Sequence, residues 1–231
     1  MEPENDLDFL ALKYGSDKFG SHWYTRQYHE NFHVMRDKEI RLLEIGIGGY
    51  DDPNSGGASL RMWKEYFPKG KISGLDYYAK PGVQEERITT FQGSQADPCV
   101  FANILDSVPE RSFDIIIDDG SHRSEHVIAS FVMMFQYVTN GGFYIVEDTQ
   151  TSYWPDHGGN YQNRADPTTT MGFFKGLIDG INWREIHRPG YTPTYADLNI
   201  RSMQFCHNMV IVRKGLNADA SNFLVNNRLP F

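Results

Sequence analysis

The sequence has little cysteine, and the two cysteines are not arranged for a cross-linked or metal-bound scaffold. Only Cys99 and Cys206 occur in 231 residues, and neither belongs to a CxxC pair. Folds held together by several disulfides and cysteine-ligated zinc sites are therefore excluded as classes. A reducing compartment is the expectation.

Long apolar runs and blocks of basic residues are also missing. No hydrophobic run approaches ~20 residues, the length of a membrane-spanning helix, and the N-terminal residues are acidic and polar, unlike a signal peptide. The formal net charge is −8, so the chain lacks the electrostatic footprint of a protein that binds nucleic acid or an acidic membrane. We therefore expect a cytoplasmic protein with a small-molecule or oligosaccharide partner, no nucleic acid and no membrane.

The chain does contain a regular alternation of short apolar runs and amphipathic segments. Strand-like runs are predicted over 40–46, 71–76, 88–92, 113–118 and 142–147, and helices over 6–14, 28–34, 59–66, 98–107, 124–138 and 171–180. This alternation is typical of an α/β, Rossmann-like fold with a mostly parallel, doubly wound sheet. The runs 200–205 and 209–213 predict a C-terminal antiparallel hairpin.

We expect residues 1–231 to form a single domain. Within it, 1–37 is predicted to be an N-terminal helical or lid segment, and 149–170 a long loop at the active site, because loops of that length inside a domain are usually functional.

A glycine-rich loop follows the first predicted strand, with the sequence Glu44-Ile45-Gly46-Ile47-Gly48-Gly49. Its glycines allow a tight turn and close approach to a ligand, but the GxGxxG pattern of dinucleotide-binding loops is absent. Two aspartates, Asp51 and Asp52, come next and would serve a pyrophosphate poorly, which disfavours NAD. Glu44 and Asp76, the acid that ends the second strand, instead suit the methionine ammonium and ribose hydroxyls of S-adenosylmethionine.

Two acidic clusters occupy the ends of later strands. Asp118-Asp119-Gly120-Ser121-His122 follows one apolar run, and Glu147-Asp148 follows the next. Because the carboxyl ends of parallel strands meet at one edge of a sheet, these side chains are expected to lie together. Several carboxylates in one place need a cation, and oxygen ligands of this kind suit Mg²⁺. His122 is then positioned to act as a general base.

Several of these segments together resemble the metal-dependent sugar O-methyltransferases of natural-product biosynthesis, the macrolide-sugar enzymes among them. The matching segments are 13–18 (KYGSDK), 43–50 (LEIGIGGY), 59–63 (SLRMW), 117–122 (IDDGSH), 147–149 (EDT) and 153–154 (YW). The resemblance covers most of residues 13–155. It implies a class I methyltransferase fold, S-adenosylmethionine as the methyl donor and Mg²⁺ at the active site.

Carried over residue by residue, the resemblance assigns roles to individual positions. Asp119, Glu147 and Asp148 match metal ligands and His122 the general base, whereas Glu44, Asp76 and the loop glycines Gly46, Gly48 and Gly49 match the donor site. The macrolide enzymes carry an additional N-terminal domain for which this chain has no room, so macrolide specificity and their oligomeric arrangement are not expected to carry over unchanged.

Further candidates come from neighbouring positions. Gln95, Asp118, Tyr14 and Asp17 are expected at the donor, and His22, Tyr24, Tyr153 and Trp154 at the acceptor. For His126, four residues after His122, we expect a structural role. A homo-oligomer, dimer or tetramer, is the expectation for assembly.

Four alternatives remain open at this point. A metal-dependent catechol or phenol O-methyltransferase would use the same fold and metal, and a nucleotide-linked deoxysugar is a second acceptor class. A nicotinamide-dependent oxidoreductase belongs to a different class and predicts GxGxxG and often a Tyr-x-x-x-Lys pair, neither of which appears at a suitable place in this chain. A non-catalytic binding subunit would be expected to lose its acids and base, which are all present.

Overall fold

A computed structural model describes residues 2–222. Its helices are α1 (Asp6–Tyr14), α2 (Thr25–Phe32), α3 (Ala58–Tyr66), α4 (Pro98–Ser107), α5 (Ser124–Met134), α6 (Thr170–Gly176), α7 (Ile178–Ile181) and α8 (Tyr195–Asn199). Its strands are β1 (Arg41–Ile45), β2 (Lys71–Asp76), β3 (Ile88–Gln92), β4 (Phe113–Asp118), β5 (Val138–Val146), β6 (Ile200–Cys206) and β7 (Met209–Lys214).

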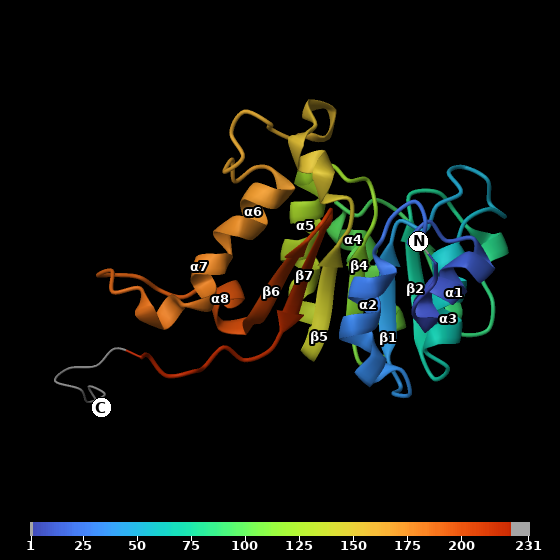
Figure 1. Ribbon diagram of the computed structural model, residues 1–231, viewed down its shortest axis with the longest axis horizontal. Coiled ribbons are helices and arrows are strands. Elements are labelled where there is room, and N and C mark those ends of the chain that lie inside the picture. Colours follow the sequence, from blue (N-terminus) through green and yellow to red (C-terminus); the bar gives the residue numbers. More distant parts are fainter. Residues whose placement is uncertain (1, 223–231) are drawn as a thin grey trace.

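The strands form one seven-stranded sheet in the order β3-β2-β1-β4-β5-β7-β6. Strands β1 to β5 pair in parallel, whereas β7 runs antiparallel to both β5 and β6. The predicted parallel sheet with a C-terminal antiparallel hairpin is therefore confirmed (Figure 1).

Successive apolar side chains in each central strand point to opposite faces of the sheet. Leu42 joins a core with α1, α2 and α3, while Leu43 joins a core with α4, α5 and α6. Tyr144 and Ile145 divide in the same way. A strand covered by helices on both faces reads as an unbroken hydrophobic run, which explains why β1 and β4 were found so readily in the sequence.

The predicted helix over 124–138 is wrong at its C-terminal end. Helix α5 ends at Met134, a 3₁₀ turn follows, and Val138 already pairs with Phe113 as the first residue of β5. The prediction extended too far because Phe135 and Val138 continue the apolar spacing of the helix. In the structure Gly141, at φ +89°, lies within β5. The predicted helix over 171–180 is likewise divided into α6 and α7.

No helix in the described part of the chain is long and apolar enough to cross a membrane.

Candidate active site at the carboxyl ends of the strands

The register of the parallel strands brings the acidic residues to one line. Across β2, β1, β4 and β5, the residues in one row are Leu75, Ile45, Asp118 and Val146. The residues that follow them in the sequence are Asp76, Gly46, Asp119 and Glu147. Acids that are far apart in the sequence are thus placed at one edge of the sheet.

Gly46 allows the loops after β1 and β4 to touch. Its φ is +81°, and a Cβ built there would lie 2.7 Å from the carbonyl carbon of Asp119 and 2.7 Å from Cα of Gly120. Real Cβ atoms essentially never come that close. Only glycine therefore lets the loop after β1 pack directly against the backbone that carries Asp119.

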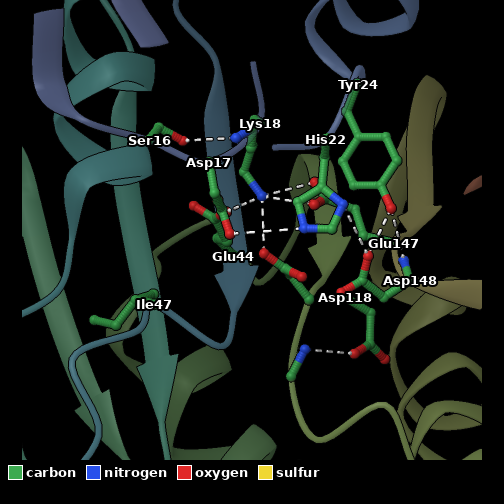
Figure 2. Close-up of polar contacts among 12 residues, drawn as sticks. Ser16, Asp17, Lys18, His22, Tyr24, Glu44, Ile47, Asp118, Glu147 and Asp148 are labelled. Carbon is green, nitrogen blue, oxygen red and sulfur yellow. Dashed lines mark hydrogen bonds and ion pairs between the residues drawn. The ribbon is translucent and has the colours of Figure 1, made fainter. Parts of the chain in front are cut away.

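A lysine that the sequence analysis did not single out lies at the centre of the acids. The Lys18 Nζ is 3.0 Å from Glu44 Oε1 and 2.7 Å from Glu147 Oε1 (Figure 2). It is also 2.9 Å from Asp119 Oδ2. Its side chain is buried, as are those of Glu44 and Glu147. Lys18 belongs to the motif at 13–18, but a lysine in a polar segment gives no sign in the sequence that it will be buried.

The buried charges of Lys18, Glu44 and Glu147 depend on one another. Burial lowers the pKa of Lys18, but the carboxylates of Asp119, Glu147 and Glu44 outweigh it and hold that pKa well above its ordinary value. Burial raises the pKa of Glu44 and of Glu147, and Asp119 raises both further, while Lys18 acts in the opposite direction. Each charge is therefore tolerated in the interior because of its partners.

Asp148 lies beside this cluster and has its own set of partners. The Tyr24 hydroxyl donates to Asp148 Oδ1 at 2.6 Å, His22 Nδ1 lies 3.6 Å from the same oxygen, and His122 Nε2 lies 3.7 Å from Oδ2. Partial burial works against the charged form, but the Tyr24 hydrogen bond, His122 and His22 together lower the pKa of Asp148 below its ordinary value. Asp148 is thus held ionised next to the imidazole of His122.

His122 and Asp148 also share an unusual backbone. Their φ values are +55° and +52°, in the left-handed region that residues with side chains seldom adopt. Such conformations cluster at functional sites, where the surrounding structure holds them. The loops after β4 and β5 therefore direct these two side chains toward each other at a cost in backbone conformation.

Three of the ligand-type side chains are close enough to hold one cation. One atom from each of Asp119, His122 and Asp148 lies within 4.8 Å of the other two. Two carboxylates and an imidazole suit a divalent ion that keeps several waters. Glu147, the remaining acid assigned to the metal by resemblance, accepts hydrogen bonds from Lys18 and from the Tyr28 hydroxyl.

The residues predicted for the methyl donor lie on the other side of Lys18. Glu44 Oε2 accepts from Trp63 Nε1 at 3.1 Å, whereas the buried Oε1 has the Lys18 ion pair but no hydrogen bond. Asp76 accepts from the backbone N–H groups of Ile47 and Tyr78 at 3.2 and 2.9 Å. The buried carboxylate of Glu44 therefore suits a methyl donor that carries an ammonium group.

The loop beyond Glu44 leaves room for such a ligand. At Gly48, with φ +72°, a Cβ would meet nothing within 4 Å. Gly49, at φ +83°, instead packs against the backbone of Ser55 and Gly56. In the loop after β1, Gly46 and Gly49 are thus packed against backbone, whereas Gly48 between them is open.

Asp118 and Gln95 form an internal network. Gln95 Nε2 donates to both oxygens of Asp118, at 2.9 and 3.1 Å, and Ser130 donates to the same carboxylate. The Gln95 Oε1 accepts from the backbone N–H of Ser121 at 2.7 Å. Burial raises the pKa of Asp118 to about 6. These bonds support the loop that carries Asp119 and His122.

Four residues predicted for the donor or the acceptor have no bond to Asp119, Glu147 or Asp148 in the described part of the chain. The Tyr14 hydroxyl bonds to Glu65 on the outer side of α3, and the Asp17 side chain is 65% exposed, 4.0 Å from His22. Tyr153 ends a 3₁₀ turn over Thr149–Tyr153, and the exposed Trp154 packs its ring edge-on to His157. His126, for which a structural role is predicted, bonds to Ser121 at 2.9 Å.

The strand order, the glycine loop after β1 and the acids near the ends of β1 and β2 together define a class I methyltransferase fold. Residues 76–175 match the family model described as rhamnosyl O-methyltransferase/CmcI. The resemblance inferred from the sequence is confirmed.

Curated relatives extend the similarity over nearly the whole chain. The mycinamicin VI 2''-O-methyltransferase of Micromonospora griseorubida is 45% identical over 216 residues, which are 92% of this chain and 53% of the relative. The demethylmacrocin O-methyltransferase of Streptomyces fradiae is 42% identical over 93% of this chain and 54% of its own length. The chain thus spans about half the length of the curated relatives it matches.

A solved structure has the same fold. The MycE methyltransferase from the mycinamycin biosynthetic pathway, in complex with Mg and SAH, superposes with a TM-score of 0.89 and 43% identity. The match covers 94% of this chain and 56% of that chain.

Proposed function

We propose that this protein is an S-adenosylmethionine- and Mg²⁺-dependent O-methyltransferase that methylates a hydroxyl of a sugar carried by a small-molecule natural product. The curated relatives are named for O-methylation of such compounds, and a solved relative was described with Mg, SAH and mycinamycin VI.

A single observation carries the proposal. At one edge of the sheet, the structure brings Asp119, His122 and Asp148 together beside Lys18, and Lys18 is also paired with the donor-side acid Glu44. A donor site and a cation site in direct contact are what a metal-assisted transfer between two bound molecules requires.

Each side chain has a defined task in this proposal. A bound divalent ion lowers the pKa of the hydroxyls it contacts and orients them. Asp119 and Asp148, with Glu147 behind them, would hold that ion. His122 would take the proton from the acceptor hydroxyl, and Asp148, 3.7 Å from His122 Nε2, would stabilise the imidazolium that results.

The chain's other predicted features belong to the same proposal. Segment 1–37 supplies Lys18, His22 and Tyr24 to the acids, which supports its assignment as a lid, and 149–170 follows the metal acids directly as the acceptor loop. A single domain, a cytoplasmic location and a homo-oligomer remain predictions. The nicotinamide alternative has no support from the family or the fold.

The first test is calorimetric titration of the protein with S-adenosylhomocysteine, with and without Mg²⁺, and with NAD⁺ as the control ligand. Micromolar binding of S-adenosylhomocysteine and none of NAD⁺ supports the proposal, and a panel of glycosides then identifies the acceptor. Preference for NAD⁺ would overturn it.

A variant separates the two roles that His122 could have. His122→Ala should abolish turnover while leaving the affinity for S-adenosylhomocysteine and Mg²⁺ unchanged if His122 is the base. Loss of Mg²⁺ binding would show instead that His122 is a metal ligand. The matched control is His33→Ala, because the ring of His33, on the 3₁₀ turn that follows α2, makes its hydrogen bond and its ring contact with His29.

A further inference from the structure

Lys18 holds three carboxylates that come from three different strands. Glu44 belongs to β1, Asp119 follows β4 and Glu147 follows β5. All three lie within 3.0 Å of the one ammonium group. Among residues 2–222, no other lysine or arginine is paired with any of them.

The backbone that carries Lys18 is fixed on both sides. Gly15, in the left-handed conformation, ends α1, and the Lys18 N–H donates to Ser16 Oγ at 3.4 Å. The Lys18 carbonyl accepts from the N–H groups of Tyr24 and Thr25, at 3.0 and 3.3 Å. The backbone of Lys18 is therefore held by a closed loop, and this loop directs the side chain toward the acids.

Carboxylates this close repel one another, and burial makes the repulsion stronger than in water. A buried ion is tolerated only where a partner compensates it. The described residues supply one compensating charge, and it is placed where Glu44, Asp119 and Glu147 converge. Asp148, by contrast, is stabilised by Tyr24 and two histidines.

We propose that Lys18 is a positioning residue whose ammonium serves as the resident counter-cation of the acid cluster, holding Glu44, Asp119 and Glu147 together before any divalent ion binds. It joins the donor acid to the metal acids and ties the loop around it, with His22 and Tyr24, to the edge of the sheet. Binding of a divalent ion then requires no prior assembly of the ligands.

The test is a double-mutant cycle on thermal unfolding in EDTA, with wild type, Lys18→Met, Glu147→Gln and the double variant. Methionine keeps the length of the lysine stem and removes the charge, so Lys18→Met should melt about 10 °C lower, because it leaves buried carboxylates uncompensated. The double variant should be no less stable than Lys18→Met, because it also removes one of the uncompensated charges. The control is Lys13→Met, since Lys13 is exposed and its one ion pair within residues 2–222 is with the exposed Glu65, and its melting should not change.

A second readout is the shift in melting temperature caused by Mg²⁺ alone. Mg²⁺ should stabilise Lys18→Met more than wild type, because the ion takes over part of the neutralisation. The Mg²⁺ readout rests on the proposed function, whereas the cycle in EDTA does not. Failure to bind S-adenosylhomocysteine would overturn the methyltransferase assignment and leave the proposed role of Lys18 unaffected.

The outcomes separate charge from packing. Wild-type melting of Lys18→Met in EDTA, or strictly additive losses in the double variant, would overturn the proposal. If Lys18→Met yields no soluble protein, a soluble and folded double variant supports a role through charge. An insoluble double variant would assign Lys18 to packing and overturn it.

Discussion

Replacement of Gly46 by alanine tests the geometry of the site most directly. The new Cβ would lie 2.7 Å from the carbonyl carbon of Asp119, and closer still to its oxygen, in a backbone with φ +81°. Left-handed backbone costs an alanine ~1–2 kcal/mol, and forced overpacking adds ~1–3 kcal/mol. We therefore expect Gly46→Ala to lower the free energy of unfolding by about 2–5 kcal/mol.

Gly141→Ala is the matched control. Gly141 has a similar φ of +89°, but a Cβ there would meet nothing within 4 Å. Only the conformational cost of about 1–2 kcal/mol should appear. Urea unfolding of the two variants and wild type, with unchanged m-values, gives the comparison.

The two variants should also differ in ligand binding. Gly46→Ala must displace the chain at Asp119, so its Mg²⁺ affinity should fall, whereas that of Gly141→Ala should stay at the wild-type value. Equal losses of stability in the two variants, with Mg²⁺ binding intact in both, would refute the close contact between the loops after β1 and β4.

Three further predictions concern single hydrogen-bonding groups. Burial raises the pKa of Asp118 to about 6 from its ordinary 3.8, so this carboxyl stabilises the folded state at low pH and the contribution is lost as the pH rises through 6. The free energy of unfolding of wild type relative to Asp118→Asn should therefore fall by about 2 kcal/mol between pH 4 and pH 7. Trp63→Phe removes the 3.1 Å bond to the buried Glu44 and should cost at least ~1.5–3 kcal/mol of stability and weaken binding of S-adenosylhomocysteine. Tyr24→Phe removes the 2.6 Å bond that lowers the pKa of Asp148, and should weaken Mg²⁺ binding about tenfold, more at acidic pH.

Exposed residues of the same types provide the controls for these variants. Trp154→Phe and Tyr161→Phe alter side chains that are 49% and 62% exposed, and both should match wild type in stability and Mg²⁺ binding. A pH-independent difference for Asp118→Asn would show that its carboxyl does not titrate in that window. Unchanged Mg²⁺ affinity in Tyr24→Phe would remove the Tyr24 hydroxyl from the support of Asp148.

The alternation of apolar runs was sufficient to predict the layers and the parallel sheet. Strands β1 and β4 are buried on both faces, and such strands consist of consecutive hydrophobic residues. It failed where local signals conflict with tertiary pairing. Asn140-Gly141-Gly142 has the composition of a turn, but pairing with β4 and β7 holds the flanking residues in a strand.

The position of the candidate site followed from the sequence for a similar reason. Once β1, β4 and β5 are parallel neighbours, their trailing acids must meet at one edge of the sheet, so Asp119, Glu147 and Asp148 could be grouped without coordinates. The partners of each acid could not be found in this way, because they come from segments distant in sequence: Tyr24 for Asp148 and Trp63 for Glu44.

The sequence by itself thus determined the sheet, the donor loop and the acidic edge, since these depend on local periodicity and on which residues end each strand. The tertiary structure decided that Lys18 is buried among the acids and that Gln95 braces Asp118 and the loop that carries His122. Neither placement has a local signal, because a lysine or a glutamine is buried only when its partners are assembled around it, and that assembly exists only in the folded chain.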